Sequence, residues 1–299
     1  MQYDIAAMVA GIPALAGWNG TPQRLGGLTN RVYRLGDVIL RIPGEGTADY
    51  IDRAAEAVAA KAAALAGVSP AVLFNDPASG IMVTRYIADT VTMTPEAFRD
   101  RKGAPARAAL ALRQLHQSGQ DFATQFALFA MIGDYLRLLS GKDVTLPAGY
   151  HDVVHEAQAV RVALARNPVP LVPCHCDPLC ENFLDTGSRM WIVDWEYSGM
   201  NDPMWDLGDL SVEAGFDAAQ DKAMLAAYFN GPPPPQDEAR MVIHKAMCDL
   251  LWTLWGLIQL ANANPAEDFQ AYADTRFARC RALMTSPGFA RHLAVLQSA

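Results

Sequence analysis

Four polar residues in the second half of the chain have the types and spacing needed to transfer a phosphoryl group to an alcohol. His175, Asp177 and Asn182 stand in the run HCDPLCEN, and Asp194 follows the apolar residues 191–193. A carboxylate such as that of Asp177 can orient a hydroxyl and take its proton. Amide and carboxylate oxygens are the hard ligands that Mg²⁺ prefers. We therefore predict Asp177 as the catalytic base, Asn182 and Asp194 as metal ligands, and His175 as a catalytic-loop residue that orients the backbone.

A predicted hairpin brings these residues together. Residues 183–185 favour a short strand, 186–188 a tight turn, and 191–193 a second strand. The run H-x-D-x-x-x-x-N has the pattern of a protein-kinase catalytic loop, and a kinase also keeps a metal-binding aspartate at the end of a strand. One such run can arise by chance, whereas the two together indicate a phosphotransferase.

Composition and charge limit the class of protein. The 299 residues are 51% hydrophobic and 19% charged, as in a globular chain large enough for two lobes. The net charge of -8 argues against nucleic-acid binding and favours a cationic partner. The apolar stretch 250–260 is too short to cross a bilayer, so we expect no integral membrane association. The apolar run 5–15 follows Asp4 and no basic residue, so we expect no signal peptide.

The five cysteines predict free thiols. Their odd number and the size of the chain favour a reducing cytoplasm over a disulfide framework. Cys174, Cys176 and Cys180 crowd around His175, but structural zinc normally needs a second pair of ligands elsewhere in the chain. We expect buried or pocket-edge thiols here.

The chain divides into a β-rich part at 1–87 and a mainly helical part at 88–299, which is an α+β architecture. In the first part we predict strands at 31–35, 38–42, 72–74 and 81–86 and a helix at 51–66. Beyond residue 87 the chain should be helical except for the catalytic hairpin. Helical periodicity occurs at 107–115, 126–139, 218–229, 241–260 and 269–284.

The first part also contains candidates for nucleotide binding. The run 26–30, GGLTN, has glycines that let backbone N–H groups approach phosphate. Arg41 could hold phosphate oxygens and pair with Glu56 on the following helix. Residues 84–87 form the hinge against which an adenine ring would lie. The candidate nucleotide-binding residues are Gly27, Thr29, Asn30, Arg41, Glu56, Thr84 and Tyr86.

At the level of these motifs the chain resembles the choline/ethanolamine kinase family, within the wider aminoglycoside-phosphotransferase-like group. The matching runs are GGLTNRVYRL, VILRIPG, YIDRAAE, GIMVTRYI, LHQSGQDF, HCDPLCENFL, IVDWEYSGMNDPMWDLGDL and LWTLWGLIQL. The resemblance implies a two-lobed protein-kinase-like fold, ATP and Mg²⁺ as cofactors, and the roles assigned above to Asp177, Asn182, Asp194, Arg41 and Glu56. One departure is Cys176, where the family usually has asparagine; if exposed, this thiol would be sensitive to oxidants.

The resemblance also implies an acceptor site for a small cationic amino alcohol. A quaternary ammonium has no N–H group, so aromatic faces and nearby carboxylates recognise it. Tyr197 follows the catalytic strand, Trp252 and Trp255 lie three residues apart on one helix, and Glu213 matches an acidic residue near the family's aromatic cage. Two tryptophans on an apolar helix are otherwise ordinary core residues, and here we expect them to serve both purposes.

Several functions fit this sequence. The leading prediction is phosphorylation of choline to phosphocholine. Ethanolamine, thiamine or an aminoglycoside could be the acceptor on the same fold, with ethanolamine depending more on Glu213. A different class of function is a nucleotide-binding pseudokinase that acts as a scaffold.

Overall fold

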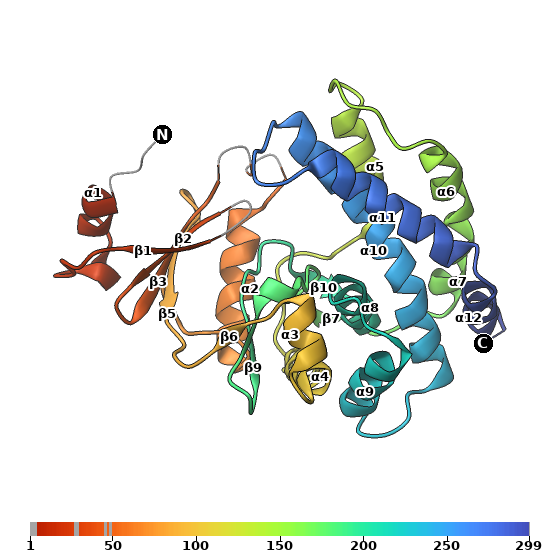
Figure 1. Cartoon of the computed structure of the whole chain (residues 1–299), viewed down its shortest axis with the longest axis horizontal. Coiled ribbons are helices and arrows are strands. Elements are labelled where there is room, and N and C mark those ends of the chain that lie inside the picture. Colours follow the sequence, from red (N-terminus) through yellow and green to blue (C-terminus); the bar gives the residue numbers. More distant parts are fainter. Residues whose placement is uncertain (1–4, 27–29, 45–46, 48–49, 299) are drawn as a thin grey trace.

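A five-stranded antiparallel sheet dominates the first 87 residues of the computed structural model, which describes residues 5–26, 30–44, 47 and 50–298 (Figure 1). The strands are β1 (Gln23–Gly26), β2 (Arg31–Leu35), β3 (Val38–Ile42), β4 (Val72–Asp76) and β5 (Ile81–Arg85), in the order β1-β2-β3-β5-β4. The predicted strands are confirmed, with β4 two residues longer and β5 one residue shorter than expected. Strand β1 was not predicted.

The alternation of side chains along β3 decides what each face of this sheet does. Leu40 and Ile42 point to one face, where they form a small core with α1 (Ile5–Ala10) and the 3-10 turn η1 (Pro13–Leu15). Arg41 lies between them and therefore points to the other face, toward α2 (Arg53–Leu65). Helix α2 begins where Asp52 accepts hydrogen bonds from the N–H groups of Ala54 and Ala55, both at 3.0 Å.

Helices make up most of the chain after residue 87. They are α3 (Pro95–Asp100), α4 (Ala104–His116), α5 (Leu128–Leu139), α6 (Tyr150–Glu156), α7 (Gln158–Arg166), α8 (Pro203–Glu213), α9 (Ala218–Phe229), α10 (Pro235–Ala261), α11 (Phe269–Met284) and α12 (Pro287–Gln297). The five predicted helices correspond to α4, α5, α9, α10 and α11. The fold is a kinase-like α+β fold with a small β-rich lobe and a larger helical lobe; the boundary at residue 87 stays a prediction.

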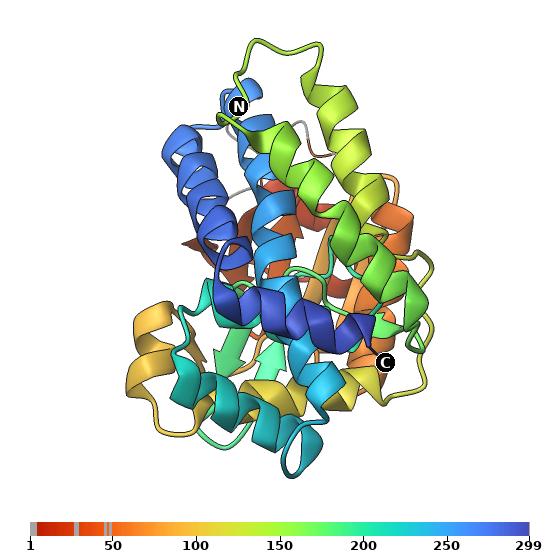
Figure 2. The same cartoon turned by 90° about the vertical axis from the view of Figure 1, so that its right-hand side faces the viewer.

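Helix α10 is the centre of the helical lobe. It packs against α5, α8, α11 and α12, and Figure 2 shows α12 lying across it. By length and composition alone α10 could cross a membrane, but 89% of its apolar window is buried inside the protein. Its apolar surface is therefore used in packing the core.

Two small sheets shape the catalytic region. Strands β8 (Phe183–Asp185) and β9 (Met190–Ile192) form the predicted hairpin, and β6 (Val91–Thr92) adds to it. Strands β7 (Val172–Cys174) and β10 (Gly199–Asn201) pair separately. The expectation that only the hairpin interrupts the helices was wrong, since β6, β7 and β10 interrupt them as well. These strands have two or three residues, which is too short to leave an alternating pattern in the sequence.

Candidate active site

One buried carboxylate holds the backbone of the catalytic loop. Asp206 on α8 accepts the N–H groups of His175 and Cys176, both at 2.8 Å, one on each oxygen. The ring of His116 lies 3.0 Å from the same carboxylate, and the indole N–H of Trp205 donates to the carbonyl of Cys176 at 3.0 Å. The loop that leads to Asp177 is therefore fixed by α4 and α8 before any substrate binds.

His175 positions the loop from inside. It is fully buried, and its Nε2 lies 2.9 Å from the carbonyl oxygen of Val193. A carbonyl can only accept, so Nε2 carries the proton and Nδ1 accepts the N–H of Asp177 at 3.3 Å. Burial lowers the pKa of His175, which favours this neutral form. The ring thus ties the loop to the end of β9 and has no nitrogen left for a substrate.

Asp177, Asn182 and Asp194 meet where the loop and the hairpin end. The amide Nδ2 of Asn182 donates to the carbonyl of Asp177 at 3.0 Å, which leaves its Oδ1 free of that bond. Val193 donates its N–H to the carbonyl of Asn182 at 2.9 Å, so the residue before Asp194 is held against the loop. Asp194 itself has a positive φ of 68°. Burial and then the negative charge of Glu196 raise the pKa of Asp194 to about 7.

These residues suit a magnesium ion. Oxygens of Glu56, Asp194 and Glu196 lie within 4.8 Å of one another, and Asn182 contacts the backbone of Asp177 on the catalytic loop. Such a set contains only hard donors, as Mg²⁺ requires. Burial, followed by the negative charges of Glu213 and Asp194, raises the pKa of Asp177 well above its usual range. Arg41 and Arg53 already pair with the carboxylates of this set, so a metal ion would add to an existing balance of charge.

A buried ionic network connects this point to the β-rich lobe. Arg41 pairs with Glu56, as predicted, and its Nη1 also lies 3.3 Å from oxygens of Asp194 and of Glu196. Arg53 at the start of α2 joins the network through Glu196 at 2.5 Å and Glu56 at 2.9 Å. The predicted phosphate-binding pair and the predicted metal ligand are thus side by side.

The other candidate nucleotide residues have mixed positions. Gly27 and Thr29 lie outside the described residues. Asn30 is buried and donates to Glu196 at 2.9 Å, so it contacts the ionic network. At the hinge Thr84 is half-buried, while Tyr86 donates its N–H to the carbonyl of Asp37 at 2.8 Å. Tyr86 therefore cannot offer that N–H to an adenine ring.

The predicted acceptor aromatics form one cluster beside the catalytic loop. The rings of Tyr197 and Trp252 meet edge-on, with centroids 5.2 Å apart, and the indole N–H of Trp255 donates to the hydroxyl of Tyr197 at 2.7 Å. Tyr50 stacks on Tyr197 at 6.5 Å, and Tyr272 lies 5.6 Å from Trp255. We call these five residues the aromatic box. Both tryptophans are buried and also belong to the core around α10.

Acidic groups and one arginine surround the aromatic box. Asp209 accepts the indole N–H of Trp252 at 3.1 Å. Glu213, one turn later on α8, pairs with Arg276 of α11 at 2.5 Å. The carbon at the centre of the Arg276 guanidinium lies 4.5 Å from the ring centroid of Tyr272. The predicted carboxylate Glu213 is thus near the box but already has a cationic partner.

Comparison with known proteins places this site in a family. The sequence profile described as "Phosphotransferase enzyme family" matches residues 21–241. A choline/ethanolamine kinase family protein from Mesorhizobium loti has 65% sequence identity and a TM-score of 0.92, with 99% of each chain covered. The chain belongs to the choline/ethanolamine kinase family of phosphotransferases.

Other members and neighbours are more distant. The choline kinase LicA from Streptococcus pneumoniae is 26% identical, with a TM-score of 0.79 over 97% of this chain and 100% of that one. Protein LicA of Haemophilus influenzae is 27% identical over 259 residues, which are 83% of this chain and 75% of that protein. An aminoglycoside phosphotransferase bound to GDP and kanamycin shares the fold at 15% identity and a TM-score of 0.68.

The departure from the family pattern at Cys176 has a structural setting. All five cysteines are free and buried, and Cys176 has no exposed surface. Burial raises the pKa of its thiol well above the usual range, so the expected sensitivity to oxidants does not apply. Cys176 has a positive φ of 67°, a conformation that asparagine adopts more readily than cysteine. The backbone at this position would therefore suit an asparagine.

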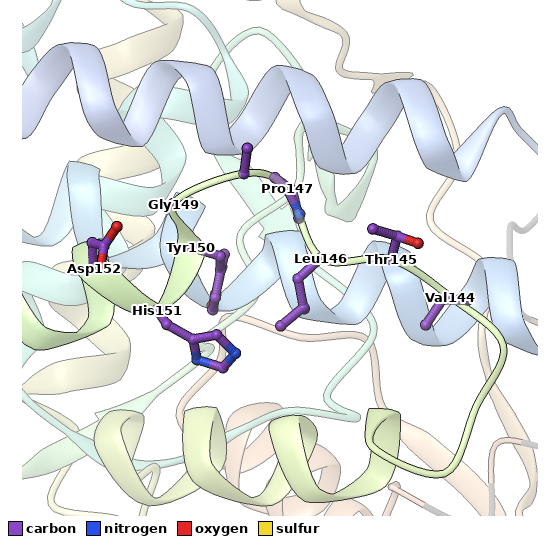
Figure 3. Close-up of a pocket in the computed structure, with 9 residues that line it drawn as sticks. Val144, Thr145, Leu146, Pro147, Gly149, Tyr150, His151 and Asp152 are labelled. Atoms are coloured by element: carbon purple, nitrogen blue, oxygen red, sulfur yellow. The ribbon is translucent and has the colours of Figure 1, made fainter.

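Two other features lie outside the candidate active site of this kinase. His116, Cys174 and Asp206 are close enough to hold a metal ion, but the hydrogen bonds of Asp206 to the catalytic loop commit its oxygens to a structural role. A surface hollow of about 630 Å³ is lined by residues 144–152, between α5 and α6 (Figure 3). None of the predicted site residues lines this hollow.

Several residues of the site were not predicted from the sequence. They are Tyr50, Arg53, Glu196, Asp206, Asp209, Tyr272 and Arg276. Glu196 could have been found, since it lies only two residues after Asp194 in the run WIVDWE. Arg276 and Tyr272 could not, because only the packing of α11 against α10 brings them to the site.

Proposed function

We propose that this kinase transfers the terminal phosphoryl group of ATP to the hydroxyl of a small amino alcohol, with choline as the principal acceptor. The observation that carries the proposal is the pairing of β7 with β10, which sets Gly199 opposite Cys174. Tyr197 of the aromatic box precedes β10, and Asp177 follows β7. Ser198, next to Tyr197, donates to the carbonyl of His175 at 3.1 Å. An ammonium group in the box would therefore have its hydroxyl arm beside Asp177.

In this proposal Asp177 orients the acceptor hydroxyl and takes its proton as the oxygen attacks phosphorus. The carboxylate belongs to a loop fixed by Asp206 and His175, so little reorganisation is needed. Burial raises its pKa, which makes the ionised carboxylate a stronger proton acceptor than an exposed one. Burial and, after it, the negative charges of Glu213 and Asp194 raise this pKa, and a cationic acceptor would partly offset these charges.

The nucleotide side of the reaction would use the ionic network. Asn182 and Asp194 would hold Mg²⁺, and this ion would neutralise charge on the phosphate oxygens. Arg41 is anchored by Glu56 and could turn a guanidinium N–H toward phosphate without moving its backbone. Support for an adenine nucleotide comes from the LicA structure in complex with AMP, which is 27% identical with a TM-score of 0.74 over 91% of this chain. We propose the cytoplasm as the compartment, since ATP is available there and the five free thiols stay reduced.

Choline suits the aromatic box better than a polar acceptor. Five aromatic rings offer faces and edges to a trimethylammonium group, which needs no hydrogen-bond acceptor. An aminoglycoside carries several ammonium groups spread over a larger molecule, and each would need its own carboxylate.

The test is a panel of acceptors assayed with labelled ATP and Mg²⁺. Choline, ethanolamine, thiamine and kanamycin are supplied separately, and the labelled product is separated from ATP. The proposal expects choline to give the highest kcat/KM. Transfer to kanamycin alone would assign an aminoglycoside kinase, and ATP binding without transfer to any acceptor would favour the pseudokinase.

A further inference from the structure

Arg276 lies beside the aromatic box and pairs with Glu213, a carboxylate that the ammonium group of a substrate could otherwise contact. Its Nη2 lies 2.5 Å from Glu213 and its Nη1 3.2 Å from Asp249, while its planar group covers Tyr272. Only 6% of the Arg276 side chain and 11% of the Glu213 side chain are exposed. A charge pair this well buried is costly to separate, because each partner would lose its counter-charge in a poorly solvated place.

The neighbouring charges keep this pair in place. Arg279, one turn along α11, binds both oxygens of Asp249 at 2.6 Å. Asp249 therefore forms ion pairs with both Arg276 and Arg279. Among the described residues, Glu213 forms its ion pair with Arg276. Asp209 is fully buried and accepts from Trp252, so its position is fixed by the box itself.

The consequence differs between the two amino alcohols. A primary ammonium has three N–H groups that lose water on entering the box, and each needs an acceptor there. Two carboxylates lie near the box. Glu213 is already engaged by Arg276. Oδ1 of Asp209 has no hydrogen-bond partner, but burial raises the pKa of Asp209 well above its usual range, which favours the neutral form and weakens it as an acceptor. A trimethylammonium has no N–H group and loses nothing by this arrangement, since the aromatic faces stabilise it directly.

We propose that Arg276 is a specificity-determining residue, which selects a quaternary over a primary ammonium alcohol by keeping Glu213 engaged. The inference rests on the proposed function, because it concerns the acceptor of that reaction. It assigns Glu213 an indirect part in acceptor binding, in place of the direct contact that the sequence predicted.

The test measures the equilibrium binding of choline and of ethanolamine, with turnover recorded separately. Arg276→Met removes the charge and keeps most of the length of the side chain. Glu213 is then free to accept from ethanolamine, so the ratio of ethanolamine Kd to choline Kd should fall about tenfold, as expected for one charge-assisted hydrogen bond. Adding Glu213→Gln to Arg276→Met should return the ratio toward that of the wild type.

Arg279→Met is the matched control, because Arg279 lies on the same helix and binds Asp249 but does not contact Glu213. The ratio should not change in this variant. An equal change of both dissociation constants in Arg276→Met, or the same fall in Arg279→Met, would overturn the inference. Binding of both alcohols without turnover would refute the proposed function and leave the Kd ratio as the test of Arg276.

A measurement on the wild-type protein covers the case in which Arg276→Met does not fold. The guanidinium N–H signals of Arg276 are followed by NMR during a choline titration and are assigned by their loss in Arg276→Lys. They should stay protected from solvent exchange when choline binds. Loss of protection on choline binding would mean that the substrate displaces Arg276 from Glu213, and would overturn the inference.

Discussion

Replacing Asp206 by asparagine tests how the catalytic loop is held. Its two carboxylate oxygens accept separate backbone N–H groups, those of His175 and Cys176, each at 2.8 Å. Asparagine has nearly the same shape but only one acceptor oxygen. Its NH₂ group would face one of these N–H groups, so a donor would meet a donor in a fully buried place.

The size of the effect follows from these contacts. A hydrogen bond to a charged group contributes about 1.5–3 kcal/mol, and a buried N–H left unpaired costs about 1–3 kcal/mol. These estimates overlap, so we expect Asp206→Asn to lower the free energy of unfolding by about 3 kcal/mol. At about 2.1 cal/mol/K per residue, the unfolding entropy of a 299-residue chain is about 0.6 kcal/mol/K. The Tm should therefore fall by about 5 °C.

The assay combines thermal unfolding with steady-state kinetics. Because the loop carries Asp177, kcat should fall at least tenfold, while the KM for ATP changes little. Asp217→Asn is the control, since Asp217 caps α9 at the surface and asparagine caps a helix equally well. A shift of Tm below 1 °C together with an unchanged kcat in Asp206→Asn would refute this account of the loop.

Three further predictions concern single side chains of the site. Because the folded-state pKa of Asp194, about 7, lies above its unfolded value near 3.9, its protonated form stabilises the fold, and this contribution is lost as pH rises through 7. We therefore expect the difference in Tm between wild type and Asp194→Asn, measured in metal-free buffer, to fall as the pH is raised from about 5 to about 8. Two curves of Tm against pH that run parallel would contradict this. Cys176→Asn should keep or raise the Tm, whereas Cys176→Val should lose about 1–3 kcal/mol of stability at its positive φ; equal Tm values would show that the backbone there is unstrained. Tyr197→Phe leaves the indole N–H of Trp255 unpaired and should raise the KM for choline severalfold but not that for ATP, and an equal rise in both would argue for a purely structural role.

Local patterns predicted the parts of the site that are close in sequence. The hairpin of β8 and β9 pairs Phe183 with Ile192, as expected from a turn at 186–188. The Arg41–Glu56 pair was also predicted, from the position of Arg41 on a strand where a kinase has its phosphate-binding lysine and of Glu56 on the helix that follows. Strands β1, β6, β7 and β10 have two to four residues, too few to show a period, and were missed; β8 and β9 are equally short and were predicted from the turn between them.

Contacts made only by tertiary packing could not be predicted. Arg276 meets Glu213 across 63 residues of sequence, and nothing in the periodicity of α11 indicates which arginine points at α8. The partnership changes the chemistry expected of Glu213. Asp206 is similar, because a carboxylate that begins a helix in the sequence turns out to hold a loop 30 residues earlier.

Asp177→Asn tests the central claim most directly. The variant keeps the size of the side chain and removes the proton acceptor, and Glu181→Gln on the same loop is its control because Glu181 is exposed. With choline, ATP and Mg²⁺, Asp177→Asn should lower kcat by about 10²–10⁴ while ATP still binds with nearly its wild-type Kd. Turnover of choline by Asp177→Asn at the rate of Glu181→Gln would contradict the assignment of Asp177 as the base and the mechanism built on it.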